Sequence, residues 1–273
     1  MKTALTIAGS DSGGGAGIQA DLKTFAAHGV YGTSAIAAVT AQNTLGVTGF
    51  VALPADIIIA QMEAVVSDIG VDAAKTGMLA SAAIVEAVAA AVDDLEIPRL
   101  VVDPVMIAKS GDRLLEEEAV AAIKTELLRR AFVVTPNAPE AEVLAGMAVR
   151  TPADAREAAR RILRLGPSAV IVKGGHLEGD EVVDLLYDGR EFTEFRGPRL
   201  ASRNSHGSGC TFAAALAAQL ALDRTLPEAT RLAKAYVVGA IRHGLPIGHG
   251  HGPMHHFWQG LPAVTVESRG SSV

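Results

Sequence analysis

Short apolar runs alternate with longer amphipathic segments along most of the 273-residue chain. The apolar runs have the length of buried strands, whereas the longer segments repeat their apolar positions with helical spacing, as Ile18, Leu22 and Phe25 do. The runs predict strands at residues 5–8, 34–40, 72–75, 100–103, 132–135 and 169–173. The amphipathic segments predict helices at residues 16–28, 55–67, 81–93, 114–130, 153–165, 210–222 and 227–243. Pro54 is expected at the first position of the helix that continues over 55–67.

Apolar strands that alternate with helices predict a largely parallel sheet covered on both faces. Residues 182–187 and 190–195 break the alternation, because two strand-like runs flank the turn dipeptide Asp188-Gly189. They predict an antiparallel hairpin at the sheet edge, and residues 47–53 predict a second, small hairpin or flap. The fold that we expect is therefore a three-layer α/β/α sandwich with a mostly parallel central sheet.

Composition and charge exclude several classes of protein. Aromatic residues make up 4% of the chain and the net charge is −6, so the basic, aromatic-lined grooves that bind nucleic acid are not expected. The most apolar stretch, residues 80–92, is interrupted by Glu86 and is too short to cross a bilayer. The chain has a single cysteine, Cys210, so no intramolecular disulfide can form, and no export signal is recognised. We therefore expect a cytoplasmic protein without a membrane partner.

No linker divides the chain, which predicts one domain at residues 1–263 and a flexible tail at 264–273.

Many of the 28 glycines fall in two clusters that border predicted helices. The first, Gly15-Ala16-Gly17-Ile18-Gln19-Ala20, fits the G-x-G-x-x-G/A pattern of dinucleotide-binding folds. Such a fold needs an acidic residue after the second strand to hold a ribose, and no Asp or Glu lies between Asp21 and Asp56. We therefore favour a loop that lets a ligand approach the backbone; a simple turn remains the alternative.

The second cluster, Asn204-Ser205-His206-Gly207-Ser208-Gly209-Cys210-Thr211-Phe212, leads into an alanine-rich helix. Free amides at a helix N-terminus, together with the positive end of the helix dipole, form an anion hole of the kind that phosphoryl transfer requires. The P-loop pattern G-x-x-x-x-G-K-[ST] is absent, and so is the G-x-S-x-G pattern of serine hydrolases. Cys210 lies in the first turn, where the dipole favours thiolate, and is a candidate base or nucleophile; a small buried hydrophobe is the alternative.

Ligands of an open parallel sheet bind beyond the carboxyl ends of its strands. Asn137 and Glu140 follow one predicted strand and offer an amide and a carboxylate suited to Mg²⁺ near phosphates, although an N-cap with an acidic first turn explains them equally well. Lys173 and Asp103 also lie at the ends of predicted strands. Lys173 could reach a phosphate and Asp103 is similarly placed; an ordinary salt bridge is the alternative for each.

Five of the eight histidines lie after residue 240, with no cysteine beside them, and we predict no transition-metal site.

Seven motifs occur in order over residues 3 to about 260, and as an ordered set they resemble the hydroxymethylpyrimidine/phosphomethylpyrimidine kinases of the ribokinase-like superfamily. The motifs are Ala8-Gly9-Ser10-Asp11-Ser12-Gly13-Gly14-Gly15-Ala16-Gly17-Ile18-Gln19-Ala20-Asp21, Thr40-Ala41-Gln42-Asn43-Thr44, Lys75-Thr76-Gly77-Met78, Asp103-Pro104-Val105, Thr135-Pro136-Asn137, Lys173-Gly174-Gly175-His176 and His206-Gly207-Ser208-Gly209-Cys210.

The resemblance implies a ribokinase-like fold and phosphorylation of 4-amino-5-hydroxymethyl-2-methylpyrimidine, first at its hydroxymethyl group and then on the resulting monophosphate, with ATP and Mg²⁺. By position it assigns the pyrimidine to Gln42, Gly9, Asp21, Met78 and the Val105 backbone. It assigns the nucleotide phosphates and Mg²⁺ to Asp103, Asn137, Glu140 and Lys173.

For catalysis the resemblance points to Cys210, at the position where related sugar kinases carry an Asp base, with Lys173 and an anion hole shaped by Gly207 and Gly209. It also implies a homodimer. The sequence departs from the family pattern at Ser205 and Ser208, where Thr is usual, and near His255, where we expect Asn.

Two alternatives remain open within this resemblance. One is a pyridoxal or pyridoxine kinase, since relatives with the same Cys-type anion hole act on vitamin B6 compounds. The other is a non-catalytic vitamin-binding regulator on the same fold. Gln42 and Met78 favour the aminopyrimidine, and the complete set of phosphate-site residues favours an enzyme.

Overall fold

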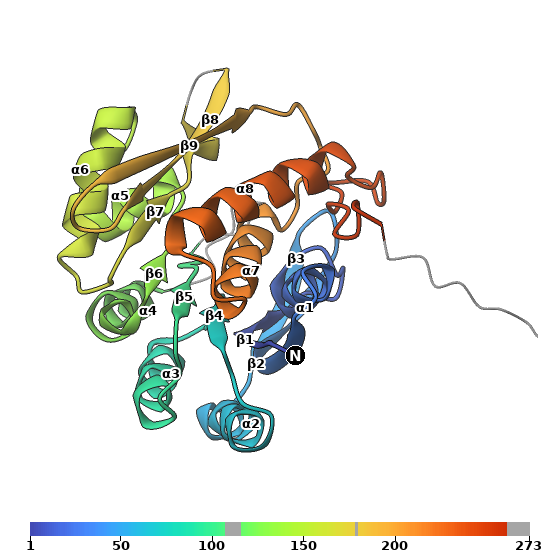
Figure 1. The fold of residues 1–273 in the computed structure, drawn as a ribbon. Coiled ribbons are helices and arrows are strands. Elements are labelled where there is room, and N and C mark those ends of the chain that lie inside the picture. The colour runs from blue at the N-terminus through green and yellow to red at the C-terminus, as the bar shows by residue number, and fades with distance from the viewer. Residues whose placement is uncertain (107–115, 178–179, 261–273) are drawn as a thin grey trace, which may run out of the picture.

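The computed structural model describes residues 1–106, 116–177 and 180–260 (Figure 1). Within these residues nine strands form one sheet in the order β3-β2-β1-β4-β5-β6-β7-β8-β9. The strands are β1 (Thr3–Ser10), β2 (Tyr31–Gln42), β3 (Val47–Ala52), β4 (Ala73–Thr76), β5 (Leu100–Val102), β6 (Val133–Val134), β7 (Val170–Val172), β8 (Glu181–Tyr187) and β9 (Phe192–Pro198). In this order, adjacent strands from β2 to β7 are parallel. Strand β3 is antiparallel to β2, β8 is antiparallel to β7, and β9 is antiparallel to β8. The predicted parallel sheet and both predicted hairpins are confirmed.

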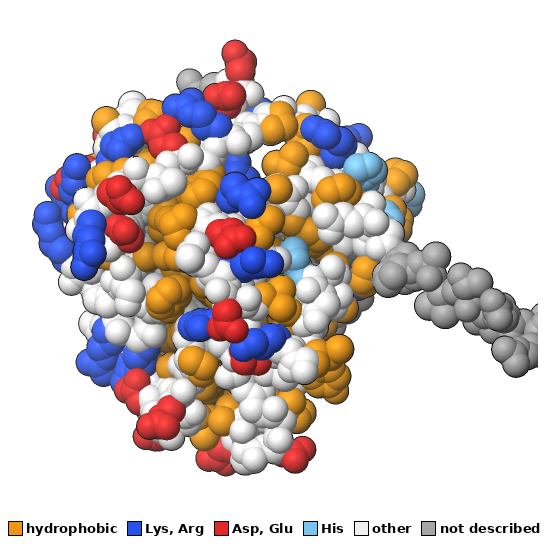
Figure 2. Space-filling model, in the orientation of Figure 1, with side chains coloured by type: hydrophobic (Ala, Val, Ile, Leu, Met, Phe, Trp, Pro, Cys, Tyr) orange, Lys and Arg blue, Asp and Glu red, His pale blue; other side chains and the backbone are white. Residues whose placement is uncertain are grey.

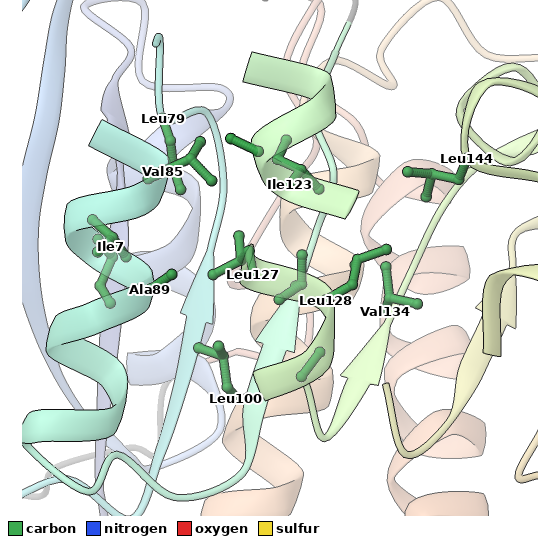
Figure 3. Packing of buried hydrophobic residues seen from close by; sticks show 14 of the residues in the cluster. Ile7, Leu79, Val85, Ala89, Leu100, Ile123, Leu127, Leu128, Val134 and Leu144 are labelled. Atoms are coloured by element: carbon green, nitrogen blue, oxygen red, sulfur yellow. The ribbon is translucent and has the colours of Figure 1, made fainter. Parts of the chain in front are cut away.

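The strands bury both faces, so successive residues belong to two different cores. Along β5, Leu100 and Val102 join one cluster of buried side chains, whereas Val101 joins the other. The first cluster is covered by α2 (Ala55–Asp68), α3 (Ala82–Asp94), α4 (Glu117–Ala122), α5 (Ala138–Ala145) and α6 (Pro152–Leu163), and Figure 3 shows part of it. The second is covered by α1 (Gly17–Ala27), α7 (Ser208–Ala221) and α8 (Leu226–Arg242). The predicted three-layer α/β/α sandwich is confirmed.

One predicted helix changes form along its length. In place of a continuous helix to residue 130, α4 is followed by a π-helical turn at Ile123–Leu127 and a 3-10 turn at Leu128–Arg130. Leu127 and Leu128 are both fully buried and lie where the π-helical turn passes into the 3-10 turn. Residues 114 and 115 lie outside the described part. Pro54 is the N-cap of α2 and not its first helical residue, because its ψ of 141° is extended.

Helix α7 is the most deeply buried helix around the second core. All its residues from Thr211 to Ala221 are buried, and it lies between α1 and α8. Alanines let the three helices approach closely while α7 also covers the sheet. Its first turn thereby points at the carboxyl ends of β1, β4 and β5. None of the helices in the described part of the chain is long and apolar enough to cross a membrane.

Candidate active site

The carboxyl ends of the central strands and the first turn of α7 enclose a cavity of about 630 Å³. It lies where the fold places ligands of an open α/β sheet. All the predicted site residues except Asp21 border it: Gly9, Gln42, Met78, Asp103, Val105, Asn137, Glu140, Lys173, Gly207, Gly209 and Cys210. These residues come from strands, loops and the first turns of helices, up to 201 positions apart in the chain.

The first turn of α7 has the properties of an anion hole. Gly207 is its N-cap in the left-handed conformation, with φ 80°, and no side chain caps the helix. Thr211 N donates to Gly207 O, whereas the amides of Gly209 and Cys210 have no acceptor among the described residues. Free amides at the positive end of a 14-residue helix would bind an anion such as a phosphoryl group.

The two glycine clusters lie against each other. A Cβ on Gly207 would lie 1.8 Å from Gly15 O, and one on Gly17 would lie 2.4 Å from Gly9 O. Only glycine permits these backbone contacts. The first cluster therefore supports the anion hole through backbone packing, which fits the predicted loop at which backbone and ligand meet closely.

Lys173 and Asp103 form an ion pair beside this anion hole. Lys173 Nζ donates to Asp103 Oδ1 at 2.9 Å, and Thr135 Oγ1 donates to the same oxygen at 3.2 Å. A Cβ on Gly209 would lie 3.3 Å from Lys173 Nζ, which shows how near the ammonium is to the α7 turn. Burial alone would lower the pKa of Lys173, but Asp103 and Glu140 outweigh it and raise that pKa. Lys173 is therefore a fixed cation.

Asn137 and Glu140 form a capping box at the start of α5. Glu140 N donates to Asn137 Oδ1 at 2.9 Å, and Asn137 N donates to Glu140 Oε2 at 2.7 Å. The N-cap alternative is thus realised, in the wall of the cavity. Burial, opposed by Lys173 and reinforced by the Asp103 carboxylate, raises the pKa of Glu140 to about 7.

These oxygen groups fit Mg²⁺ held mainly by water and phosphate. Asp103 Oδ2 and Glu140 Oε1 have no hydrogen-bond donor among the described residues, so each presents a free carboxylate oxygen close to the anion hole. Mg²⁺ commonly takes one or two carboxylates and completes its shell with waters and substrate phosphates. Across the described ranges there is no cluster of three or more His, Cys, Asp or Glu side chains that would hold a metal by themselves.

We expect Glu140→Gln to change how stability depends on pH. Because the folded-state pKa of Glu140 lies above its ordinary value of 4.5, the folded protein binds this proton more tightly than the unfolded chain. Its contribution is therefore present below about pH 4.5 and is lost as pH rises through about 7. Urea unfolding at pH 5 and pH 8 should show the variant gaining about 1–3 kcal/mol relative to the parent at the higher pH. An equal difference at both values would contradict this assignment.

Cys210 borders the cavity as predicted, but not in the predicted protonation state. Burial, reinforced by Asp21 and Asp103, raises the pKa of its thiol to about 11 although Lys75 and the Gly17 amide oppose the shift. Burial therefore acts against the thiolate that the helix dipole was expected to favour. At neutral pH the group is a thiol that can orient a hydroxyl.

Gln42, Met78 and Gly9 form another part of the cavity lining. Gln42 Nε2 lies 3.3 Å from His206 Nε2, which lies 3.1 Å from Asp11 Oδ2. Burial acts against ionisation of Asp11, but the contacts with His206 and the loop amides outweigh it and lower the pKa of this carboxyl. His206 and Asp11 thus connect this part of the lining with the anion hole, a role that sequence reasoning missed.

Asp21 does not lie where the resemblance placed it. Its side chain is fully buried, does not border the cavity, and accepts hydrogen bonds from Lys75 Nζ at 3.0 Å and Thr6 Oγ1 at 2.7 Å. In this structure Asp21 holds Lys75 from behind the cavity lining, and its assignment to the pyrimidine stays a prediction. The missing information was the direction in which α1 turns the side chain, toward β1 and β4.

A second ion pair shapes the far end of the cavity. Asp184 Oδ1 accepts from the Gly174 amide at 2.9 Å, and Asp184 Oδ2 accepts from Lys234 Nζ at 2.8 Å. The pair fixes the backbone directly after Lys173. Apolar side chains, among them Val182, Pro198, Val237 and Ile241, complete this end, where a flat base would find apolar cover. Sequence reasoning missed the pair because its members are 50 residues apart.

These features define a class of protein: a small-molecule kinase of the ribokinase-like fold, in which one cavity joins a phosphate-binding helix terminus to a pocket for a small acceptor. The phosphomethylpyrimidine kinase family model matches residues 11–255, and the chain belongs to this family. The sequence-based identification and the predicted kinase function are thereby confirmed.

Similar proteins agree with this assignment. The chain is 49% identical over 255 residues to the hydroxymethylpyrimidine/phosphomethylpyrimidine kinase of Bacillus subtilis, covering 93% of this chain and 94% of the relative. It is 51% identical to the thiamine biosynthesis bifunctional protein ThiED of Geobacter sulfurreducens, and there it spans 97% of its own length but about half, 54%, of the relative. Among solved structures, the ADP complex of Bacillus subtilis pyridoxal kinase superposes with a TM-score of 0.89 at 39% identity, over 95% of this chain and 98% of that one.

Proposed function

We propose that this protein phosphorylates 4-amino-5-hydroxymethyl-2-methylpyrimidine with ATP and then phosphorylates the monophosphate. The observation that carries the proposal is a single cavity lined both by the free α7 amides with Lys173 and by Gln42 with Met78. A carboxamide and a thioether suit a planar heterocycle that carries an amino group. The ADP complex of the related pyridoxal kinase supports a nucleotide as the second ligand.

In this proposal the acceptor ring lies against Met78 with its amino group at Gln42, and its hydroxymethyl oxygen points toward Cys210. The amides of Gly209 and Cys210 and the Lys173 ammonium hold the γ-phosphoryl group. The acceptor oxygen gives its proton to water and forms a bond to phosphorus as the bond to the β-phosphate oxygen breaks. Charge on the equatorial oxygens is met by these donors. When bound at Asp103 and Glu140, Mg²⁺ supplies charge neutralisation for the phosphates.

The proposal predicts turnover of both pyrimidines. ATP consumption is measured in parallel with hydroxymethylpyrimidine, its monophosphate and pyridoxal, for the parent and for Gln42→Met. The parent should turn over both pyrimidines, and the variant should lose about tenfold or more in kcat/KM for them, because one lost ring hydrogen bond costs about 1–2 kcal/mol. No turnover of either pyrimidine would overturn the proposal.

Pyridoxal kinase activity is the second candidate, favoured by the TM-score of 0.89 to a pyridoxal kinase. The same assay decides between the two. If pyridoxal has the higher kcat/KM and Gln42→Met leaves it unchanged, the vitamin B6 activity is the main one. A non-catalytic regulator would bind these compounds without consuming ATP.

We also propose that the protein acts in the cytoplasm as a homodimer, joined through the β2–β3 edge of the sheet. Four apolar side chains are largely exposed there: Val39 at 48%, Leu45 at 68%, Phe50 at 47% and Val51 at 67%. Edge strands with exposed apolar side chains commonly pair with another chain. On the face drawn in Figure 2, Lys and Arg are interspersed with Asp and Glu. The charges on that face therefore form no patch of a single sign.

The dimer proposal predicts that Val51→Asp yields a monomer. A carboxylate buried in the interface would cost several kcal/mol, whereas exposed on a monomer it costs little. Sedimentation equilibrium measures the mass of each protein. Val143→Asp, at an apolar residue exposed by 42% on α5, is the matched control and should leave the parent's mass unchanged. A parent that sediments as a monomer would refute the dimer.

A further inference from the structure

His206 lies in the wall of the cavity, where the two glycine clusters meet. A Cβ on Gly15 would lie 2.5 Å from His206 Cδ2, so the glycine leaves the space that the ring occupies. The His206 amide donates to Gly252 O at 3.2 Å, which fixes the backbone behind the ring. Ring atom Nε2 then lies 3.1 Å from Asp11 Oδ2 and 3.3 Å from Gln42 Nε2. One nitrogen of the ring therefore faces two side chains.

The surroundings of Asp11 decide where the ring carries its hydrogen. Asp11 Oδ1 accepts from the Gly13 amide at 2.8 Å, and Oδ2 accepts from the amides of Gly15 and Ala16 at 3.0 Å and 2.8 Å. An ionised carboxylate suits three N–H donors, whereas a protonated one would turn a hydrogen toward them, so Asp11 acts as an acceptor only. Its contact with His206 is then a hydrogen bond in which Nε2 donates. This holds for the neutral ring and for the imidazolium alike.

The Gln42 carboxamide can take two orientations that differ by a half turn. The half turn exchanges its oxygen and its nitrogen, so the hydrogen-bond partners alone distinguish the two. With Gln42 Nε2 toward His206, two N–H groups face each other across 3.3 Å. Gln42 Oε1 then lies 3.3 Å from Thr40 Oγ1, whose one hydrogen is donated to the closer Ser10 O at 2.8 Å. Neither end of the carboxamide has a good hydrogen bond in this orientation.

With its oxygen toward His206, the carboxamide gains a partner at both ends. His206 Nε2 donates to the Gln42 oxygen as well as to Asp11. The Gln42 nitrogen donates to Thr40 Oγ1, because a hydroxyl can accept while it donates elsewhere. The Gln42 backbone is fixed too, since its amide donates to Ser12 Oγ at 2.8 Å. One N–H and one oxygen lone pair of the carboxamide remain for a ligand in the cavity.

We propose that His206 is a positioning residue that sets the specificity of the acceptor site, because it holds the Gln42 carboxamide with the oxygen on the His206 side. The site then selects a ring with an amino group beside an unprotonated ring nitrogen, which donates to this oxygen and accepts from the carboxamide nitrogen. A 4-oxo ring has a carbonyl beside an N–H, the reverse pattern, and would place acceptor against acceptor and donor against donor. The statement about the ring rests on the proposed function, and the orientation of Gln42 does not.

The test compares the binding of 4-amino-2,5-dimethylpyrimidine and 2,5-dimethylpyrimidin-4-one, which lack the hydroxyl that would be phosphorylated. Titrations followed by NMR measure the two Kd values for each protein. The parent should bind the amino ring about a hundredfold more tightly, because both contacts of the oxo ring are mismatched. His206→Met should lower this ratio at least about tenfold, since the carboxamide can then turn to suit either ring. A parent without the preference, or an unchanged ratio in His206→Met, would overturn the proposal.

Two further variants separate positioning from a general effect on the fold. His206→Gln keeps an N–H donor near the place of Nε2 and should restore most of the ratio. His249→Met replaces an exposed histidine and is the matched control, which should keep the parent's ratio within about twofold. Failure of His206→Gln to bind better than His206→Met discriminates, with both proteins folded, would contradict a role of the donor.

A measurement on the parent alone keeps the proposal testable if His206→Met does not fold. Nitrogen-15 shifts of the His206 ring, identified by through-bond correlation to its backbone, should show the hydrogen on Nε2. A ring that carries its hydrogen on Nδ1 only would overturn the proposal. Kinase assays distinguish it from the proposed function: turnover of neither pyrimidine, with the binding ratios shifted as expected, refutes the kinase activity and leaves the role of His206 standing.

Discussion

Gly207→Ala is expected to lower kcat at least a hundredfold. Its Cβ would lie 1.8 Å from Gly15 O and 3.1 Å from the Ala16 Cα, and both neighbours are backbone that no rotamer change can move aside. The two glycine loops must then separate, and the free amides at the start of α7 leave their positions. Removal of a single preorganised donor to a transition-state anion commonly costs about 10²–10³ in kcat.

Gly146→Ala is the matched control for this effect. Gly146 also has a left-handed backbone, with φ 64°, at the end of α5, but a Cβ there meets nothing within 4 Å. Gly146→Ala should lower stability by about 1 kcal/mol through backbone strain, measured by urea unfolding. Gly207→Ala should lower it by more, because the contact with the Gly15 carbonyl adds to the same strain. Only Gly207→Ala should lose activity. If both variants keep kcat within fivefold of the parent, the anion hole does not depend on the contact between the loops.

The sequence allowed the architecture to be predicted because both faces of the strands are apolar. Runs such as residues 100–103 and 169–173 are recognisable without tertiary information, and each became a central strand. The π-helical turn at Ile123–Leu127 was not predictable in this way. Its residues fit an ordinary helical pattern, and nothing in that pattern indicates a change of hydrogen-bond spacing.

For the site, position was predictable and electrostatics was not. Strand-end residues such as Asp103 and Lys173 were placed in the cavity by the general rule for open α/β sheets. The raised pKa of Cys210 was not predictable, because the helix dipole can be inferred from the sequence whereas the amount of lost hydration cannot.

Side-chain direction and long-range partners were also beyond the sequence. Asp21 lies on the predicted helix, but its side chain turns into the core toward Lys75. His206 and Asp11 are 195 residues apart and meet only through the packing of two glycine loops. A titratable residue inside a glycine-rich motif was the one local sign that His206 has a role.

Lys173→Met is expected to lower kcat about 10²–10³-fold, because the variant loses the cation nearest the free α7 amides. It should also destabilise the protein by about 3–5 kcal/mol, since Asp103, 2% exposed, would keep a buried negative charge with Thr135 as its remaining hydrogen-bond donor. Single-turnover kinetics with hydroxymethylpyrimidine and urea unfolding measure the two effects separately.

The double variant Lys173→Met/Asp103→Asn separates the role of Lys173 in stability from its role in phosphoryl transfer. The neutral amide removes the unpaired buried charge, so most of the lost stability should return. Activity should not return, because the phosphoryl group still lacks its ammonium and a candidate Mg²⁺ ligand has been weakened as well. If activity recovers together with stability, Lys173 serves the fold and the phosphoryl group is held by the α7 amides alone.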